Sequence, residues 1–331
     1  MYFQIMKAEF STITALNTKK FKILDMTNLQ KNEIVQLIET EKNRLGSYAK
    51  VATKCDVSTA TISQMVRNNW DLIKTELWSK VGFALGYDDS EWQIAETLGY
   101  KKVANICNDA KNEAFFMILS SPAGMGKTAP LKTYYELNSD NDVFYIKCRE
   151  WAKREFLVEL CKSLGIDSSK YYVHVDKLGA KVSEFFNQRK GKKPLLIVDD
   201  AGKLRDSAIR WFIHLFDENE DDMGCLIAGT EYLEKRIKDG VRLKKLGYDE
   251  IESRFGRTYL SLIGTTQKDA QIICSVNGIH DKALQNKLFE ECKPIKKIIT
   301  TKEGNVSIRV IEDLRRLKRV IKRERLKLQY A

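Results

Sequence analysis

The sequence predicts an α/β protein built on a parallel sheet, and two observations support this prediction. Short apolar runs alternate with amphipathic helical segments through the middle of the chain, at 115–119, 143–146, 195–198, 225–228 and 259–263. Such runs are typical of strands that helices cover on both faces. The composition, 43% hydrophobic and 31% charged with 18 glycines and 4 prolines, provides a sizeable core and little flexible linker.

The length of 331 residues favours two or three domains, because domains of about 100 to 200 residues are typical. Residues 1–30 have no assignable role, apart from a possible short strand at 21–24. The rest divides into an all-α block at 31–90, with helices expected at 32–41, 47–55, 59–67 and 71–85, the α/β unit at 91–264, and a C-terminal unit at 265–331. The apolar strand signal ends with the α/β unit, so the last unit is expected to contain helices alone.

Positive charge is concentrated near the C-terminus. Residues 293–331 contain thirteen lysines and arginines against four acidic residues, which accounts for most of the net charge of +11. Such a field suits a partner covered in phosphates, because bound lysine and arginine release the counterions condensed on nucleic acid. An ordinary basic, solvated helix remains the alternative interpretation.

The seven cysteines are odd in number, scattered and without CxxC spacing, so neither a disulfide framework nor a zinc site is expected. The N-terminus shows no export signal, and no apolar run approaches the roughly 20 residues of a membrane helix. We therefore expect a cytoplasmic protein with no membrane partner.

A phosphate-binding loop is predicted by SPAGMGKT, which follows the first apolar run and precedes a helix. In such a loop backbone N–H groups surround a phosphate, Lys127 reaches the β- and γ-phosphates, and the Thr128 hydroxyl holds Mg²⁺. The motif usually begins with glycine, and a small residue, Ser121, stands there instead. The residues expected to hold ATP are Ser121, Pro122, Ala123, Gly124, Met125, Gly126, Lys127, Thr128 and Ala129.

A second element of the same site is predicted by LLIVDD at 195–200. Its two aspartates follow a buried strand, and ligands of open α/β sheets bind at the carboxyl ends of strands. Asp199 is expected to coordinate Mg²⁺ directly or through water, and Asp200 to orient or deprotonate the attacking water. ATP and Mg²⁺ are therefore the expected cofactors, and ATP hydrolysis the expected reaction. A buried strand with two exposed carboxylates is the alternative.

Four further residues are candidates for contact with the γ-phosphate or its water. Thr230 ends the next apolar run and is expected beside the first two elements. Arg254 and Arg257 precede the last run, and one of them is a candidate arginine finger for a neighbouring subunit's nucleotide. Ordinary surface arginines are the alternative for this pair. Arg309 is expected in the first turn of a helix, within reach of its own chain's γ-phosphate.

The N-terminal block contains a candidate DNA-binding element, SYAKVATKCDVSTATISQMVRNN. It predicts two helices separated by a turn at 56–58, and it resembles a repressor-type helix-turn-helix. The residues of the second helix expected to reach base edges or phosphates are Thr59, Thr61, Gln64 and Arg67. A helical domain for protein contacts is the alternative, and sequence-specific readout stays open because phosphate and base contacts use similar residues.

Between about residues 93 and 328, the succession SPAGMGKT, LLIVDD, LIAGT, ESRFGR and SIRVIEDL resembles an AAA+ ATPase with a helical lid. With the helix-turn-helix and the basic C-terminus, the chain is most similar to the transposition target-selection family of phage Mu B and Tn7 C proteins. This resemblance implies a homo-oligomeric ring or helical filament on largely nonspecific double-stranded DNA, which delivers that DNA to a transposase and stimulates transposition.

The resemblance also implies roles for particular residues. Lys127, Thr128, Asp199, Thr230 and Arg254 or Arg257 take the roles given above. Asp200 stands where the family usually has glutamate, one methylene longer, which bears on the rate of hydrolysis. In related DNA-encircling ATPases the segment after the second strand faces the duplex, so the resemblance implies that Arg149, Lys153 and Arg154 contact the DNA backbone. A purely structural role is the alternative for these three residues.

Two other functions fit the same motifs. A replication initiator or helicase loader would use the same ATPase chemistry with a replicative helicase as its partner. A transcriptional regulator would use ATP as a switch and read an operator through the second helix of the helix-turn-helix.

Overall fold

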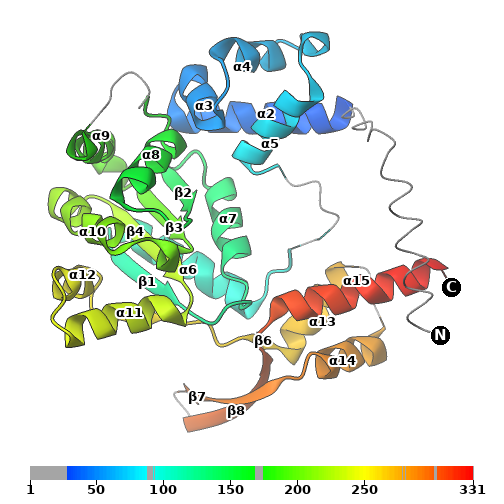
Figure 1. Cartoon of the computed structure of the whole chain (residues 1–331). Helices are drawn as coiled ribbons and strands as arrows, with labels where there is room; N and C mark the ends of the chain where they lie inside the picture. Colours follow the sequence, from blue (N-terminus) through cyan, green and yellow to red (C-terminus); the bar gives the residue numbers. More distant parts are fainter. Residues whose placement is uncertain are drawn as a thin grey trace, which may run out of the picture.

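The structure is a computed structural model that describes residues 28–87, 92, 94–167, 174–277, 279, 281–301 and 304–330. The possible strand at 21–24 lies outside these residues. Figure 1 shows three parts: a helical block, a central α/β unit, and a C-terminal unit from which a β-hairpin projects. Within the described residues, the helices are too short or too polar to cross a membrane.

The helical block has helices where the sequence predicts them, with a short 3₁₀ turn and a helix in place of the single helix at 71–85. Side-chain oxygens cap two of them: Ser47 accepts from the Lys50 N–H and Ser58 from the Thr61 N–H. Between these helices Asp56 adopts a left-handed conformation with φ of 52°. The elements are α2 (Asn28–Leu45), α3 (Tyr48–Cys55), α4 (Thr59–Val66), η1 (Trp70–Leu72) and α5 (Thr75–Leu85).

The central sheet is parallel, with strand order β2-β3-β4-β1-β5. This confirms the predicted fold class, an α/β fold consistent with a P-loop AAA+ core. The last strand covers two residues, fewer than the predicted run at 259–263. The strands are β1 (Phe116–Ser120), β2 (Val143–Lys147), β3 (Leu195–Asp199), β4 (Gly224–Gly229) and β5 (Tyr259–Leu260).

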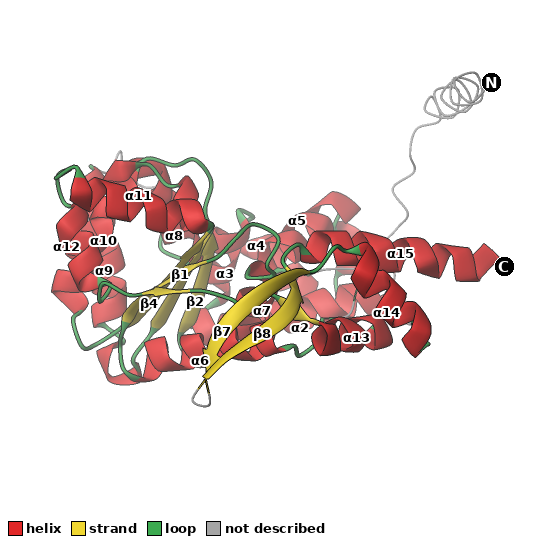
Figure 2. Cartoon of the chain, turned by 90° about the horizontal axis from the view of Figure 1, so that it is seen from below, coloured by secondary structure: helices red, strands yellow, loops and turns green. Residues whose placement is uncertain are grey.

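Two groups of helices cover the two faces of this sheet, as Figure 2 also shows. Successive residues of β3 point to opposite faces of the sheet: Leu195 and Ile197 pack with α6 and α7, and Leu196 and Val198 pack with the helices on the other face. The first group is α6 (Leu98–Asn112) and α7 (Thr128–Leu137). The second is α8 (Lys153–Ser163), α9 (Val175–Asn187), α10 (Asp206–Asn219), α11 (Glu231–Arg242) and α12 (Tyr248–Arg254); the short turns are η2 (Lys190–Lys192) and η3 (Ala201–Lys203).

The C-terminal unit, here called the lid, contains a sheet as well as helices, so the prediction of helices alone is wrong. Its strands form an antiparallel sheet in the order β6-β8-β7. The β-branched residues of IKKIITT and VSIRVI favour extended backbone, and paired in a hairpin they outweigh the helical pattern. The elements are β6 (Thr265–Thr266), α13 (Gln267–Val276), α14 (Lys282–Glu291), β7 (Ile295–Thr301), β8 (Gly304–Ile311) and α15 (Leu314–Tyr330).

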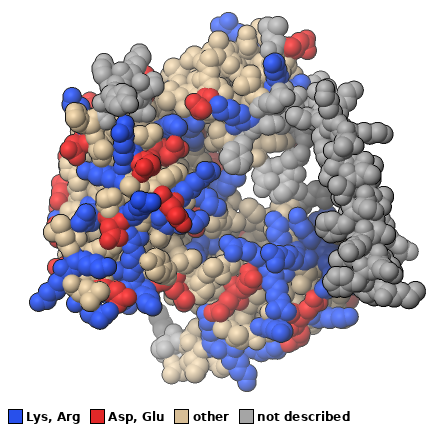
Figure 3. All heavy atoms as spheres, in the orientation of Figure 1, with Lys and Arg blue, Asp and Glu red and all other residues tan. Residues whose placement is uncertain are grey.

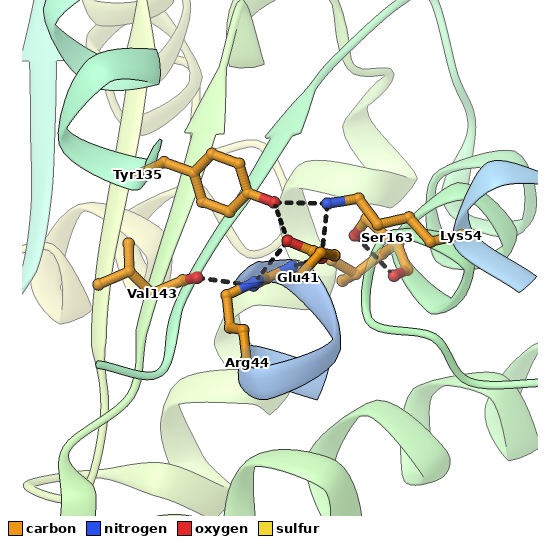
Figure 4. A network of polar contacts seen from close by, with 7 residues as sticks. Glu41, Arg44, Lys54, Tyr135, Val143 and Ser163 are labelled. Atoms are coloured by element: carbon orange, nitrogen blue, oxygen red, sulfur yellow. Dashed lines mark hydrogen bonds and ion pairs between the residues drawn. The ribbon is translucent and has the colours of Figure 1, made fainter. Parts of the chain in front are cut away.

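Buried charges join the helical block to the α/β unit (Figure 4). Glu41 of α2 accepts hydrogen bonds from Arg44 Nε at 3.0 Å, Lys54 Nζ at 2.8 Å and the Tyr135 hydroxyl at 3.0 Å. Arg44 also donates to the carbonyl oxygen of Val143 in β2, at 2.6 Å. We call Glu41, Arg44, Lys54 and Tyr135 the docking network; it ties α2 and α3 to α7, the helix that follows the phosphate loop.

The docking network keeps Glu41 ionised. Burial alone would raise its pKa, but the charges and hydrogen bonds of Lys54 and Arg44 lower the pKa of Glu41 to about 2. A carboxyl group whose pKa is lowered in the folded state stabilises the fold at pH values above its normal pKa of about 4.5. This contribution to stability is lost as the pH falls towards 2.

Replacing Glu41 with Gln is expected to lower the free energy of unfolding by about 3 to 5 kcal/mol near pH 7, because Arg44 and Lys54 then remain buried without their counter-charge. Urea titration measures this loss. The matched control is Asp239→Asn, which breaks an exposed pair with Arg242 and is expected to cost less than about 1 kcal/mol. Equal losses in the two variants would refute a structural role for the buried network.

Candidate nucleotide-binding site

The candidate site lies where the carboxyl ends of β1, β3 and β4 meet. Strands β1 and β3 flank β4 in the sheet. The chain segments that follow β1 and β3 leave the sheet in different directions, and a crevice lies between them beyond the carboxyl ends of the strands. A cavity of about 890 Å³ opens at this point, within the range of about 300 to 1,000 Å³ typical of ligand sites. It is lined by the loop 123–129, by Asp200 and Thr230, by parts of α2 and α7, and by the lid.

The phosphate loop connects β1 to α7. Gly124 and Gly126 have φ angles of 88° and 82°, a left-handed conformation that glycine adopts without strain. Ser121, in place of the usual first glycine, is buried, and its hydroxyl accepts a hydrogen bond from the Leu262 N–H at 2.8 Å. The serine thus fastens the segment after β5 to the start of the loop.

Lys127 folds back onto its own loop. Its ammonium donates to the carbonyl oxygens of Ser121 at 2.7 Å and Pro122 at 2.9 Å. Burial lowers the pKa of Lys127, and the charges of Asp199 and Asp200 oppose that shift. A phosphate at the loop therefore gives this buried cation a counter-charge in place of two carbonyl dipoles.

Asp199 at the end of β3 is only 1% exposed. One carboxylate oxygen accepts from the Asp200 N–H at 2.9 Å, and the other from the Tyr145 hydroxyl at 3.0 Å. Burial raises the pKa of Asp199, and a hydrogen bond with Thr128 is the first of the effects that oppose this. Thr128 and Asp199 therefore lie together, as the sequence predicts for the metal site.

These two side chains fit magnesium. Both offer hard oxygen donors, and Mg²⁺ is commonly held by one or two carboxylates together with phosphates and water. Among the described residues there is no cluster of three or more His, Cys, Asp and Glu side chains that suits a metal ion. With Mg²⁺ held by Thr128 and Asp199, phosphate oxygens and water would complete the coordination.

Asp200 and Thr230 line the same cavity. Asp200 has a left-handed backbone with φ of 58°, and its carboxylate pairs with Lys203 at 2.7 Å. Thr230 precedes the first turn of α11. The structure thus brings together the phosphate loop, Asp199, Asp200 and Thr230, whose roles remain predictions.

Comparison with known proteins finds a family match in the central part of the chain. Residues 110–237, fewer than half of the chain, match the family model of the AAA domain. This segment is therefore similar to AAA domains. No curated protein matches the chain.

Solved structures that match the chain include Cdc6p from Pyrobaculum aerophilum, at 18% identity and a TM-score of 0.43, covering 57% of this chain and 51% of that one. The ORC2 protein of Aeropyrum pernix, in ADPNP–ADP complexes, matches at 13% identity and a TM-score of 0.43, and the match covers 56% of this chain and 54% of that one. Drosophila ORC bound to AT-rich DNA and Cdc6 matches at 12% identity and a TM-score of 0.34, and the match covers 68% of this chain and 91% of that one. The matches span about half the length of the first two chains.

The lid lines the cavity and contacts the phosphate loop. The N–H of Leu314, the first residue of α15, donates to the carbonyl oxygen of Gly124 at 2.9 Å. A Cβ on Gly124 would lie 2.5 Å from an Asp313 carboxylate oxygen, and a Cβ on Gly126 would lie 2.5 Å from Leu314. A side chain at either position would therefore displace the side chain of Asp313 or Leu314, in addition to straining the loop conformation.

Arg309 does not occupy the predicted position. It lies in β8 rather than in a helix, and it forms a two-pronged ion pair with Glu290 of α14, at 2.8 and 2.6 Å. The hairpin moves the start of the helix to Leu314, so Arg315 lines the cavity instead. Arg315 and Lys127 line the same cavity, and the charge of Arg315 acts to lower the pKa of Lys127.

Arg254 and Arg257 are absent from the lining of their own chain's cavity. Arg254 ends α12 and pairs with Asp217 at 2.7 Å. Arg257 follows with a left-handed φ of 51°, and it pairs with Asp249 and Glu252 at 2.9 and 3.1 Å.

Sequence reasoning missed much of the rest of the lining, and two of the missed parts come from segments distant in the chain. The first comes from α2 of the helical block, through Glu33, Gln36, Leu37 and Thr40. The second is Trp92, whose ring centroid lies 4.9 Å from the Lys318 ammonium of the lid. No local motif marks either part, because both depend on how distant segments pack.

The predicted DNA-contacting residues lie on two surfaces. In the helical block Thr59 and Arg67 are exposed and Thr61 and Gln64 half-buried, while Ile62 and Met65 face the core. After β2, Arg149 and Arg154 are exposed, whereas Lys153 is half-buried and pairs with Asp176 at 3.0 Å.

Replacing Arg315 with Ala is expected to weaken ATP binding about tenfold, because a hydrogen bond to a charged group contributes about 1.5 to 3 kcal/mol. Isothermal titration calorimetry with ATP measures this. The matched control, Arg309→Ala, is expected to bind within about twofold of the unmodified protein. A larger loss with Arg309→Ala would restore the role that the sequence predicted for it.

Proposed function

We propose that this chain is an ATP-hydrolysing, DNA-binding AAA+ protein that assembles on duplex DNA and delivers it to a transposase. The observation that carries the ATPase part is the convergence of the phosphate loop, Thr128, Asp199 and Asp200 at one edge of the sheet, around a ligand-sized cavity. The DNA and transposase parts rest on surface charge and on the sequence resemblance described above.

In the proposed reaction, water attacks the γ-phosphorus of ATP. A bond forms between this phosphorus and the water oxygen, and the bond between the phosphorus and the bridging oxygen of ADP breaks. Asp200 orients the water or accepts its proton, for which its pair with Lys203 must open. Lys127 and Arg315 bind phosphate oxygens and stabilise negative charge. When bound through Thr128 and Asp199, Mg²⁺ neutralises the developing charge on the phosphates.

We expect the substitution of aspartate for the usual glutamate to lower the rate of ATP hydrolysis more than the affinity for ATP. Asp200 is one methylene shorter than glutamate, and its left-handed backbone conformation and ion pair hold it close to β3. A general base must lie within hydrogen-bonding reach of the water, so the shorter side chain affects turnover more than affinity.

Exposed basic residues support the DNA part of the proposal. Helix α15 buries Leu317, Val320 and Ile321 in the lid core and exposes Arg319 and Lys322 to solvent. Figure 3 shows lysine and arginine side chains gathered over α15. Contacts of this kind are to phosphates and are independent of base sequence.

Self-association is supported by the position of Arg254 and Arg257. Both lie outside their own chain's cavity. We propose that one of them contacts the nucleotide of a neighbouring subunit, so that assembly completes the catalytic site. Arg257 is the more exposed, with 53% of its side chain accessible against 24% for Arg254.

ATP is expected to drive high-order assembly of the protein on arbitrary duplex DNA, and Lys127→Ala is expected to abolish it. Electron microscopy with a slowly hydrolysed ATP analogue shows such assemblies directly. The control Lys101→Ala removes an exposed lysine of α6 and should assemble normally. A protein that stays monomeric at all nucleotide and DNA concentrations would refute the proposal.

The double variant Arg319→Ala, Lys322→Ala is expected to weaken DNA binding and to reduce the slope of log affinity against log salt by about 2, because each basic side chain that no longer neutralises a phosphate lowers the slope by about 1. Fluorescence anisotropy over a salt series measures the slope. The control Lys101→Ala, Lys102→Ala removes the same charge from α6. Equal slopes in both variants would exclude α15 as the DNA-binding surface.

Two outcomes would favour the other functions. Enrichment of one sequence in a random-site selection would favour a transcriptional regulator that reads through α4. Specific binding of a replicative helicase, without binding of a transposase, would favour a replication initiator or helicase loader.

A further inference from the structure

Tyr145 of β2 lies against the metal side of the nucleotide site. Strands β2 and β3 are paired in parallel register, with Tyr145 opposite Ile197 and Lys147 opposite Asp199. The tyrosine side chain extends along the sheet, and its hydroxyl donates to a carboxylate oxygen of Asp199 at 3.0 Å. An aromatic residue from the neighbouring strand therefore holds the carboxylate expected to bind Mg²⁺.

We propose that Tyr145 is a positioning residue that orients Asp199 for Mg²⁺ binding; this inference rests on the proposed ATPase function. A carboxylate has about four lone-pair positions. The Tyr145 hydroxyl and the Asp200 N–H occupy one on each oxygen, and the hydrogen bond with Thr128 uses a third. Asp199 thus keeps a fixed orientation with a lone pair remaining for the metal or a water ligand of the metal. Outer groups that orient a metal ligand affect metal affinity without touching the ion.

The position of Tyr145 is itself fixed by its surroundings. Its ring lies 5.7 Å from that of Tyr135, with the two planes 31° apart. Tyr135 is 8% exposed and donates to Glu41 of the docking network. The helical block therefore limits the movement of Tyr135, and Tyr135 limits the movement of Tyr145. A hydroxyl held in this way loses little conformational entropy when it orients Asp199.

Replacing Tyr145 with Phe isolates the hydroxyl, because the ring and its packing are retained. The expected effect is a loss of about tenfold in Mg²⁺-dependent ATP affinity, with ATP affinity in EDTA unchanged. Fluorescent ATP binding measured with and without Mg²⁺ gives both values. The Mg²⁺ concentration that gives half of the Mg²⁺-dependent gain in ATP affinity should rise by the same factor.

The matched control is Tyr134→Phe. Tyr134 lies next to Tyr135 in α7, and its hydroxyl donates to Asn108 at 2.8 Å rather than to Asp199. The substitution removes this hydroxyl and keeps the ring. This variant is expected to keep the normal Mg²⁺ dependence. Urea unfolding of both variants establishes that they are folded under the conditions of the binding experiment.

The outcomes separate the inference from the proposed function. If the unmodified protein binds ATP more tightly with Mg²⁺ and Tyr145→Phe behaves identically, the positioning role is wrong while the nucleotide site stands. An equal loss of affinity with and without Mg²⁺ would also overturn the inference, because it indicates general disruption. Failure of the unmodified protein to bind ATP would overturn both.

Discussion

A carboxylate buried at the end of a strand is the constraint on which the site depends. Removing a charge from water costs several kcal/mol unless hydrogen bonds and counter-charges compensate. Asp199 receives hydrogen bonds from the backbone of Asp200 and from Tyr145, and its charge acts on Lys127. Mg²⁺ held by Asp199 and Thr128 would add a positive charge in direct contact with this carboxylate.

A second set of buried charges fixes what surrounds the site. The docking network attaches the helical block to α7 and β2. Because α7 begins at Thr128 and α2 lines the cavity, the helical block is joined to the phosphate loop through α2 and α7. The lid contacts the same loop from the other side through Leu314 and Gly124. A nucleotide would therefore contact all three parts of the molecule at once.

The sequence predicted the parts of the fold and site that are local. A glycine-rich loop between strand and helix, and two aspartates after an apolar run, carry their geometry within a few residues, so SPAGMGKT and LLIVDD could be located without the structure. The hairpin at 295–311 was missed because its lysines and arginine, spaced among isoleucine and valine, also fit a basic amphipathic helix. That error moved the expected phosphate contact from Arg315 to Arg309.

Other features depend on tertiary contacts that no local pattern encodes. The hydrogen bond from Tyr145 to Asp199 follows from the register of two strands about fifty residues apart. The contribution of α2 to the cavity follows from the docking network, whose members come from segments far apart in the chain.

The most direct test of this account is a high-resolution structure of the protein with duplex DNA, Mg²⁺ and a slowly hydrolysed ATP analogue. The account predicts the triphosphate against Lys127 and Arg315, Mg²⁺ between Thr128 and Asp199, and Arg254 or Arg257 of a neighbouring subunit at the γ-phosphate. An assembly on DNA with this cavity empty, or with the nucleotide bound elsewhere, would contradict it.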